Sequence, residues 1–265
     1  MATTKVRYNQ IKTGLPAGGD VNYNDVSLLL NMNGTDGSTT FTDSSSSGHN
    51  ITANGNASIS TSEFKFGGSS AYFDGNGDYL AVASSSRLAF DTADFTFEGW
   101  ANITTHLDAP KMFTNWSGNP FSANHWSLHI DHPTNSEKVS FWFYNHSGSS
   151  PLLVSTSSIS TNTWYHIAVT RNGNTFRLFV NGIEEASATS SASIDGGGSF
   201  PVEIGGDSIA TDRYLHGYLD GLRITKNVAR YTSNFSVPTA AFPAFESKEG
   251  KGLRVGANGT IELES

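Results

Sequence analysis

The sequence contains no cysteine among its 265 residues. Disulfide bonds and thiol chemistry are therefore excluded. It also contains no apolar run long enough to span a membrane, and its first ten residues, MATTKVRYNQ, have no apolar signal-peptide core. We therefore expect a protein that is made in a cytosol, has no membrane partner, and leaves the cytosol only through assembly, lysis or a non-classical route.

Charged residues are scarce, at 15% of the chain, and basic residues are the scarcer kind, with 16 Lys and Arg against 24 Asp and Glu. The net charge of −8 argues against nucleic acid as a partner, because nucleic-acid binding requires a basic surface. Acidic loops are compatible with calcium binding. Acidity that only keeps the protein soluble is an equally good interpretation.

No stretch shows the periodicity of an amphipathic helix. Aromatic residues, in contrast, reach 12% of the chain, and 27 residues are glycine. Aromatic residues that alternate with polar ones, punctuated by Gly and Asn, are typical of short strands and tight turns. The length suits one large β domain, so we predict an all-β sandwich of two antiparallel sheets.

The clearest pattern is the stretch 163–182, TWYHIAVTRNGNTFRLFVNG, which reads as two strands joined by a tight turn. Asn172-Gly173 is typical of two-residue hairpin turns, because both central residues of a type I′ turn require positive φ. A turn at these residues places Val169 opposite Phe176. It also predicts one apolar face made of Tyr165, Ile167, Val169, Phe176, Leu178 and Val180. The other face, with His166, Ala168, Arg177 and Phe179, is mixed, as expected for a surface that is partly covered or meets a partner.

The composition divides the chain into three parts. Residues 1–24 are mildly basic and contain the flexible joint GLPAGGD, so we predict an N-terminal arm, with a disordered start as the alternative. Residues 25–245 hold the strand patterns and form the predicted domain, with a short helical turn expected over 227–235. Residues 246–265 read as a polar joint and a small hairpin turning at Asn258-Gly259. A lone hairpin is marginally stable in water, so this tail is expected to need a partner surface.

Four stretches within 25–245 resemble a known family: SSAYFDGNGDYLAV, DFTFEGW, NTWYHIAVTRNGNTFRLFVNG and HGYLDGLRITKNVARY. In this order they are similar to laminin-G-like, concanavalin A-like jelly-roll domains. The resemblance implies two packed antiparallel sheets and, in many members, a structural calcium ion. The last stretch, with its continuation YTSNFSVPTAAFPA, looks most like versions of the domain in tailed-bacteriophage virion proteins. Members also serve as glycan-binding modules, adhesins and accessories of polysaccharide enzymes, so the fold does not settle the function.

The resemblance also implies where calcium would bind. The family's loop aspartate and late-strand aspartate match Asp43 and Asp220, with backbone oxygens expected near Gly48 to Asn50. Carboxylate and backbone oxygens from loops are the ligands that Ca²⁺ prefers. Asp43, Asn50 and Asp220 are therefore the predicted metal residues. The alternative is that Asp43 makes an Asx turn and Asp220 a structural hydrogen bond.

Catalytic and zinc patterns are weak. Jelly-roll glycosidases need paired carboxylates, whereas Glu184 and Glu185 are neighbours that point to opposite faces of a strand, and Glu98 has no acidic partner on its own strand. His125, His129 and Asp131 are spaced too widely along one strand to hold one zinc ion, so a polar, solvated sheet face is expected there. We therefore predict that the protein is not an enzyme.

Carbohydrate binding is the remaining possibility, because tryptophan rings can stack on sugar faces. Trp116, in the loop-like stretch NWSGNPF, is the tryptophan that we expect to be exposed and ligand-binding. The other four are expected mostly in the core: Trp100, Trp126, Trp142 and Trp164.

The combined prediction is a non-enzymatic structural or appendage protein of a bacteriophage virion, as a capsid decoration or a tail or fibre component, with a jelly roll that recognises host-surface glycans. The arm and the tail would attach it to other virion proteins, and a homo-oligomer is expected. The alternative is a carbohydrate-binding or adhesion module of a bacterial cell-surface or secreted protein.

Overall fold

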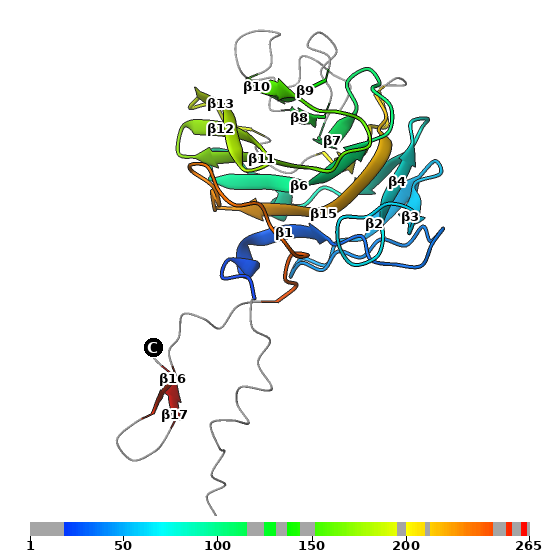
Figure 1. The fold of residues 1–265 in the computed structure, drawn as a ribbon. Helices are drawn as coiled ribbons and strands as arrows, with labels where there is room; N and C mark the ends of the chain where they lie inside the picture. The colour runs from blue at the N-terminus through cyan, green and yellow to red at the C-terminus, as the bar shows by residue number, and fades with distance from the viewer. Residues whose placement is uncertain are drawn as a thin grey trace, which may run out of the picture.

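The computed structural model describes residues 19–115, 125–130, 137–143, 152–194, 200–209 and 213–245, and the backbone of two short strands at 253–255 and 261–263. Two antiparallel sheets pack face to face (Figure 1). Helical structure in these ranges is limited to two single 3-10 turns, η1 (Tyr23–Asp25) and η2 (Ser86–Leu88). None of the described helices could cross a lipid bilayer. The predicted all-β sandwich is confirmed.

The larger sheet has eight strands, and β6 (Phe95–Ile103) and β15 (His216–Lys226) form its centre. Its order is β13 (Ile183–Thr189), β12 (Thr175–Val180), β11 (Tyr165–Asn172), β6, β15, β4 (Ser70–Asp74) and β3 (Ser58–Ser60), and β1 (Val26–Leu30) also pairs with β15. All pairs are antiparallel.

The smaller sheet has seven strands in the order β10 (Leu153–Ser158), β9 (Lys138–Phe143), β8 (Trp126–His129), β7 (Lys111–Thr114), β14 (Val202–Ile204), β5 (Tyr79–Val82) and β2 (Ile51–Asn54). The tail strands β16 (Leu253–Val255) and β17 (Ile261–Leu263) pair with each other, as expected of a hairpin. Their connection, with Asn258-Gly259, lies outside the described residues.

Aromatic side chains fill the space between the two sheets. Phe97 stacks on Phe95, with ring centroids 4.5 Å apart, and on Trp126 of the facing sheet, with centroids 4.4 Å apart. The alternation within β6 produces this packing, since every second residue of a strand points to the same side. Trp126 is thus a core residue, as predicted. Trp100, in contrast, alternates with Phe97 and Ala101 and is buried on the outer face of the eight-stranded sheet.

The central hairpin forms, but its predicted register is wrong. Val169 lies opposite Leu178, and the two turn residues are Gly173 and Asn174. Gly173 has a φ of +58° whereas Asn174 has a negative φ, which is the pattern of a type II′ turn with glycine at its first central position. The pairing moves by two residues, so the predicted apolar face is unchanged, and its members line the core.

Two side chains hold the turn at this position. The backbone N–H of Gly173 donates to Asp94 Oδ1 over 2.7 Å, and Arg171 Nε donates to the Gly173 carbonyl over 2.8 Å. Asp94 comes from a different part of the chain, so the turn type depends on a tertiary contact that the dipeptide Asn172-Gly173 does not reveal.

The outer face of the eight-stranded sheet is partly covered by residues 227–245, which we call the strap. Tyr231 and Phe235 of the strap stack with centroids 3.5 Å apart and lie against Phe179. The helical turn predicted over 227–235 is absent. Backbone carbonyl groups of the strap accept hydrogen bonds from side chains of the sheet instead. Thr96 Oγ1 donates to the Val228 carbonyl and Thr170 Oγ1 donates to the Tyr231 carbonyl, both over 2.9 Å.

Residues 19–24, the end of the predicted arm, contact the sandwich. The backbone N–H of Asp20 donates to the Phe245 carbonyl over 3.0 Å, and Tyr23 Oη donates to the Ser44 carbonyl over 2.8 Å. Only 6% of Asp20 is exposed. The described part of this segment is therefore packed against the domain, beside the end of the strap.

Candidate functional site

Asp43, one of the predicted calcium ligands, anchors the loop that follows β1. Its Oδ1 accepts hydrogen bonds from the backbone N–H groups of Leu29 and Ser45, over 3.0 and 2.9 Å. Its Oδ2 accepts from Ser45 Oγ over 2.9 Å and from the His49 N–H over 2.7 Å. A carboxylate has about four lone-pair sites, so these four donors leave none for a cation.

Asp220, the second predicted ligand, lies on β15 and is 1% exposed. Its Oδ2 accepts from the backbone N–H groups of Lys65 and Phe66, over 2.8 and 2.9 Å, which ties residues 61–68 to the sheet. Its Oδ1 is buried without a hydrogen-bond partner. Burial raises the pKa of Asp220 to about 6, although the backbone N–H groups of Phe66, Lys65 and Gly221 and the Lys65 charge act in the other direction.

The donors to Asp43 and Asp220 come from different segments, and no hydrogen bond or ion pair within the described ranges joins the two carboxylates. Asn50 is exposed and forms a bridge with Thr42 that closes the Asp43 loop. No group of three or more His, Asp or Glu residues in the described part of the chain is arranged to hold a metal ion. A shared ion does not fit Asp43 as it is bonded, and calcium binding stays a prediction. Trp116 lies outside the described residues.

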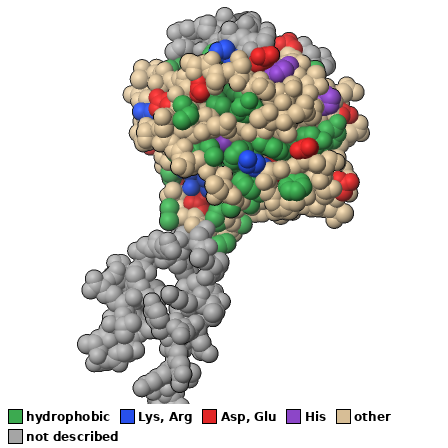
Figure 2. Space-filling view, in the orientation of Figure 1, with side chains coloured by type: hydrophobic (Ala, Val, Ile, Leu, Met, Phe, Trp, Pro, Cys, Tyr) green, Lys and Arg blue, Asp and Glu red, His purple; other side chains and the backbone are tan. Residues whose placement is uncertain are grey.

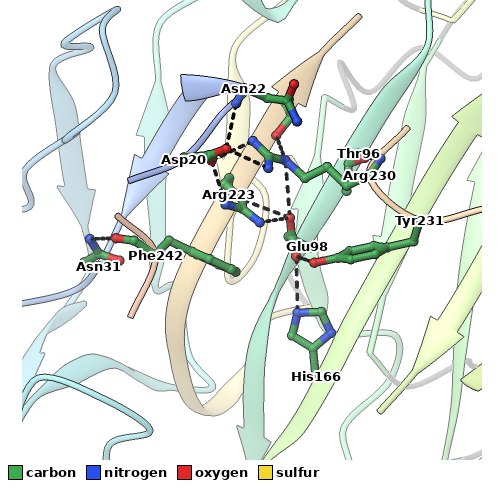
Figure 3. A network of polar contacts seen from close by, with 11 residues as sticks. Asp20, Asn22, Asn31, Thr96, Glu98, His166, Arg223, Arg230, Tyr231 and Phe242 are labelled. Carbon is green, nitrogen blue, oxygen red and sulfur yellow. Dashed lines mark hydrogen bonds and ion pairs between the residues drawn. The ribbon is translucent and has the colours of Figure 1, made fainter. Parts of the chain in front are cut away.

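A buried charge network lies beneath the strap (Figure 3). We define it as Asp20, Glu98, His166, Arg223, Arg230 and Tyr231. Arg223 donates to Glu98 Oε1 from Nε and Nη2, over 2.9 and 2.7 Å, and to Asp20 Oδ2 from Nη1 over 2.9 Å. Arg230 donates to both oxygens of Asp20 over 3.0 and 2.7 Å. Tyr231 Oη donates to Glu98 Oε2 over 2.7 Å, and His166 Nε2 lies 3.4 Å from the same oxygen.

The simple alternation of side chains along β15 does not predict this network, because Gly221 interrupts the alternation between the two faces of the strand. Gly221 has a φ of +52° and lies in a β-bulge between Asp220 and Arg223, so both of these side chains reach the outer face. Arg223 thereby pairs with Glu98 across β6, and its guanidinium stacks over the Phe242 ring of the strap at 3.8 Å.

The network is structural rather than catalytic. Two carboxylates face two guanidinium groups, and such a balance is what allows charges to be buried. Burial alone would raise the pKa of Glu98, but Arg223, His166 and Arg230 outweigh it and lower the pKa to about 2. A carboxyl group with this pKa is not a general acid at neutral pH, and the side chain is fully buried.

The other carboxylates that the sequence analysis weighed serve structural contacts. Glu184 lies 3.4 Å from Arg177, whereas Glu185 accepts from Ser157 Oγ of β10 over 2.7 Å, so the two point to different neighbours, as predicted. Asp74 and Asp78, which the sequence analysis did not consider, lie close together. Asp78 is fully buried, and its Oδ2 accepts from the Asp74 N–H over 2.7 Å within the β4–β5 turn.

The expected solvated histidine face is wrong. His125 and His129 are 0% and 3% exposed. His125 Nδ1 lies 2.9 Å from the Asn115 carbonyl and its ring packs on Phe200, while His129 lies against Trp142 with centroids 5.9 Å apart. Burial lowers the pKa of His125. Asp131 lies outside the described residues.

The outer face of the eight-stranded sheet has a second, half-exposed part beyond the strap. There Tyr218 of β15 lies directly between Tyr72 of β4 and Asn102 of β6. The β6–β11 register pairs Tyr165 with Ala101, so its continuation by one residue places Trp164 beside Asn102. We call this row of four side chains from neighbouring strands the shelf: Tyr72, Asn102, Trp164 and Tyr218.

The shelf combines aromatic rings with polar atoms that have no partner. Tyr72, Trp164 and Tyr218 are half-buried, and the rings of Tyr72 and Tyr218 lie 5.1 Å apart. Asn102 is 4% exposed. Neither its Oδ1 nor Trp164 Nε1 has a hydrogen-bond partner among the residues that the structure describes. Buried polar atoms in folded proteins are usually bonded to protein, water or an ion, so these two atoms require a partner such as a water molecule or a ligand hydroxyl group.

Sequence reasoning missed the shelf. Trp164 was expected in the core together with Trp100 and Trp142, but all three lie on outer faces. Each alternates with core residues: Trp142 with Phe141 and Phe143, for example. The same alternation in AYFD and GYLD would have assigned Tyr72 and Tyr218 to an outer face, but it does not show that β4 and β15 are neighbours.

Solved structures with the same fold include several binding domains. They include the binding domain of Paraclostridial Mosquitocidal Protein 1, with a TM-score of 0.60 and 15% identity over 78% of this chain and 50% of that one. Domain 4 of AbnA, a GH43 extracellular arabinanase from Geobacillus stearothermophilus solved in complex with arabinotriose, has a TM-score of 0.57 and 19% identity over 76% of this chain and 92% of that one. The botulinum neurotoxin serotype G binding domain has a TM-score of 0.56 and 12% identity over 77% and 48%.

These identities show a common fold and no more, and the chain spans about half the length of the two toxin binding domains. No curated protein matches the sequence. Residues 74–230, however, match the Laminin G 3 family model, described as the concanavalin A-like lectin/glucanases superfamily. Since the match covers more than half of the chain, this protein belongs to the concanavalin A-like lectin/glucanases superfamily.

Proposed function

We propose that the protein is a non-enzymatic, glycan-binding component of a virion, and that the shelf is its binding surface. The observation that carries glycan binding is the juxtaposition of three half-exposed aromatic rings with the unpartnered Asn102 Oδ1 and Trp164 Nε1. Sugars present both C–H faces, which pack on aromatic rings, and hydroxyl groups, which bond to polar atoms beside them.

The same geometry favours binding over catalysis. Glycoside hydrolysis requires two carboxyl groups on either side of the scissile bond. Of the carboxylates on the central strands, Asp220 of β15 is held by the N–H groups of Lys65 and Phe66, and Glu98 of β6 is closed beneath the strap. The solved relatives in fold also include domains named for binding, and one is in complex with arabinotriose.

The virion assignment rests on the likeness of residues 216–245 to phage versions of the domain and on the two flanking segments, 1–24 and 246–265. We propose that these segments attach the protein to other virion proteins as a capsid decoration or a tail or fibre component. The alternative is a carbohydrate-binding or adhesion module of a bacterial surface or secreted protein, which would use the same shelf. Mass spectrometry of purified phage particles tests the proposal, and recovery of the protein only from bacterial envelopes or culture medium would support the alternative.

Glycan binding is tested by titrating the full-length protein with host-surface polysaccharide and with arabino-oligosaccharides. Tyr218→Ala and Trp164→Ala are expected to weaken binding at least about tenfold, equal to about 1.4 kcal/mol. Tyr79→Ala and Trp142→Ala are matched controls, because they remove half-buried aromatic side chains from the seven-stranded sheet. Equal losses in both pairs, with all variants folded, would refute the shelf as the binding surface.

A further inference from the structure

The shelf is an elongated row of side chains rather than a closed pocket. Its side chains come from three successive strands, β4, β15 and β6, and from Trp164, the residue directly before β11. Neighbouring strands lie about 4.8 Å apart, so the row is about 14 Å long and runs perpendicular to the strands. Three aromatic side chains at such intervals present stacking surfaces to several sugar rings in succession. A single sugar ring would leave most of the row uncovered.

The polar atoms of the shelf select for hydroxyl groups. Asn102 Oδ1 can only accept a hydrogen bond, and Trp164 Nε1 can only donate one. Both atoms are buried and lack partners, and they are neighbours in the row. A hydroxyl group donates and accepts, so a neutral sugar can satisfy both atoms. A carboxylate or sulfate group only accepts, so it could not take the place of a hydroxyl group at Asn102 Oδ1.

The charged groups around the shelf are mostly acidic. Glu63 is exposed, and its carbonyl accepts from Ser70 Oγ of β4 over 2.6 Å. Burial, Tyr72 and the charge of Glu63 together raise the pKa of Tyr218, which places Glu63 within electrostatic reach of the shelf. Asp74 ends β4 opposite His216, and Asp220 follows Tyr218 on β15 by two residues.

The positive groups on this side are few. Lys65 lies over the Trp100 ring, with Nζ 3.9 Å from the ring centroid, and His216 lies on β15 opposite Asp74. Lys226, at the far end of β15, donates to the Ser86 carbonyl, and His166 of β11 faces Glu98 in the buried charge network. Arg223 forms ion pairs with Glu98 and Asp20 in the buried charge network and is not available to a ligand on the shelf. Lys and Arg side chains on the face seen in Figure 2 are isolated from one another and form no basic patch. An anionic ligand would therefore meet net repulsion at neutral pH.

We infer that the ligand is an uncharged oligosaccharide of several sugar units that lies across β4, β15, β6 and β11. This inference rests on the proposed function and adds the charge, the length and the direction of the ligand. Tyr72 and Trp164 then contact sugars at opposite ends of the bound chain, and Tyr218 with Asn102 contacts the middle.

The test is a glycan array probed with the full-length protein, carrying neutral oligosaccharides of increasing length and matched chains that contain uronate or sialic acid. Affinity is expected to rise with the length of the neutral chain and then level off, and to be insensitive to salt. Tyr72→Ala should weaken binding of long neutral chains at least tenfold. Glu63→Lys should leave neutral binding unchanged and increase binding of uronate chains several-fold, while Glu184→Lys on β13, the matched charge change away from the shelf, should do neither.

Different failures have different meanings. Preferential binding of anionic chains that is lost in Tyr218→Ala would overturn the inference and leave the proposed function intact. A monosaccharide that binds as tightly as any longer chain would also overturn it. If no glycan of either charge binds, or if binding is unaffected by Tyr72→Ala, Trp164→Ala and Tyr218→Ala together, the proposed function fails as well.

Discussion

Replacing Asp220 with Asn is expected to make the protein more stable at neutral pH, because the ionised carboxylate is buried at a cost. Asn has the same shape, and its carbonyl oxygen can accept from the N–H groups of Lys65 and Phe66 as Oδ2 does. Its amide group would replace Oδ1, which has no hydrogen-bond partner. The substitution therefore removes a charge and keeps the two contacts to Lys65 and Phe66. The new amide N–H groups gain no acceptor, so the cost of burying the charge is an upper limit for the gain in stability.

The magnitude follows from the pKa. Burial raises the pKa of Asp220 from 3.8 to about 6, and each unit is worth 1.36 kcal/mol, so ionisation costs the folded state up to about 3 kcal/mol at pH 7. The folded protein binds a proton more readily than the unfolded chain does. The penalty is thus fully present above pH 6 and is lost as the pH falls from 6 towards 3.8. The free energy of unfolding of Asp220→Asn should exceed that of the wild type by up to about 3 kcal/mol at pH 7, and the two should differ little at pH 4.

Urea unfolding in the presence of a chelator, at several pH values between 4 and 7.5, measures this difference. Glu98→Gln is the matched control on the same face of the sheet, because the pKa of Glu98 is lowered to about 2. Its ionised form stabilises the protein above pH 4.5, so the control should lose about 3 kcal/mol at pH 7 and less as the pH falls below 4.5. An Asp220→Asn variant that is less stable at pH 7, or whose gain does not shrink towards pH 4, would refute the reasoning.

Three further predictions concern the turn, the N-terminal segment and calcium. Gly173→Val should lower the free energy of unfolding by at least about 1–2 kcal/mol, because Gly173 has positive φ and a β-branched residue resists it; an unchanged melting temperature would contradict the turn. Deleting residues 1–18 should leave the melting temperature unchanged, whereas deleting residues 1–21 also removes Asp20 from Arg223 and Arg230 and should cost about 3–5 kcal/mol in unfolding experiments. If calcium joins Asp43 and Asp220, calcium should raise the melting temperature after chelation, magnesium should raise it less, and Asp43→Ala should abolish the response; identical melting with calcium and with chelator would exclude the site.

Local alternation predicted the sheets well, and tertiary contacts account for the errors. The apolar face of β11 and β12 follows from residue types alone, since strand side chains alternate. The turn was misplaced because Asp94, far away in sequence, accepts the Gly173 N–H. The helical turn over the strap was wrong because Thr96 and Thr170 supply side-chain donors for carbonyl groups that a helix would have bonded internally.

The candidate sites depended even more on long-range contacts. Asp43 was predicted as a calcium ligand, with an Asx turn as the alternative, and its lone pairs are used by Leu29, Ser45 and His49. Glu98 and Arg223 are 125 residues apart, and a bulge at Gly221 brings them together, so no local pattern predicts the pair. The shelf likewise needs the order of the strands, which a single sequence does not give.

The outer face of the eight-stranded sheet thus serves two purposes that do not compete. On one part, Asp20 and the strap are held to β6 and β15 by a network whose charges balance, and Asp20 and Phe245 meet there in a backbone hydrogen bond. Segments that leave the domain from residues 20 and 245 therefore start from one place. The shelf lies on another part of the face, where it crosses β4, β15 and β6 and reaches the start of β11, beyond Trp100 on β6. If the flanking segments hold a neighbouring protein while the shelf holds a glycan, both contacts can form at once. A mechanical force between the flanking segments and the bound glycan would then be carried by the central strands β6 and β15, which each pair with strands on both sides.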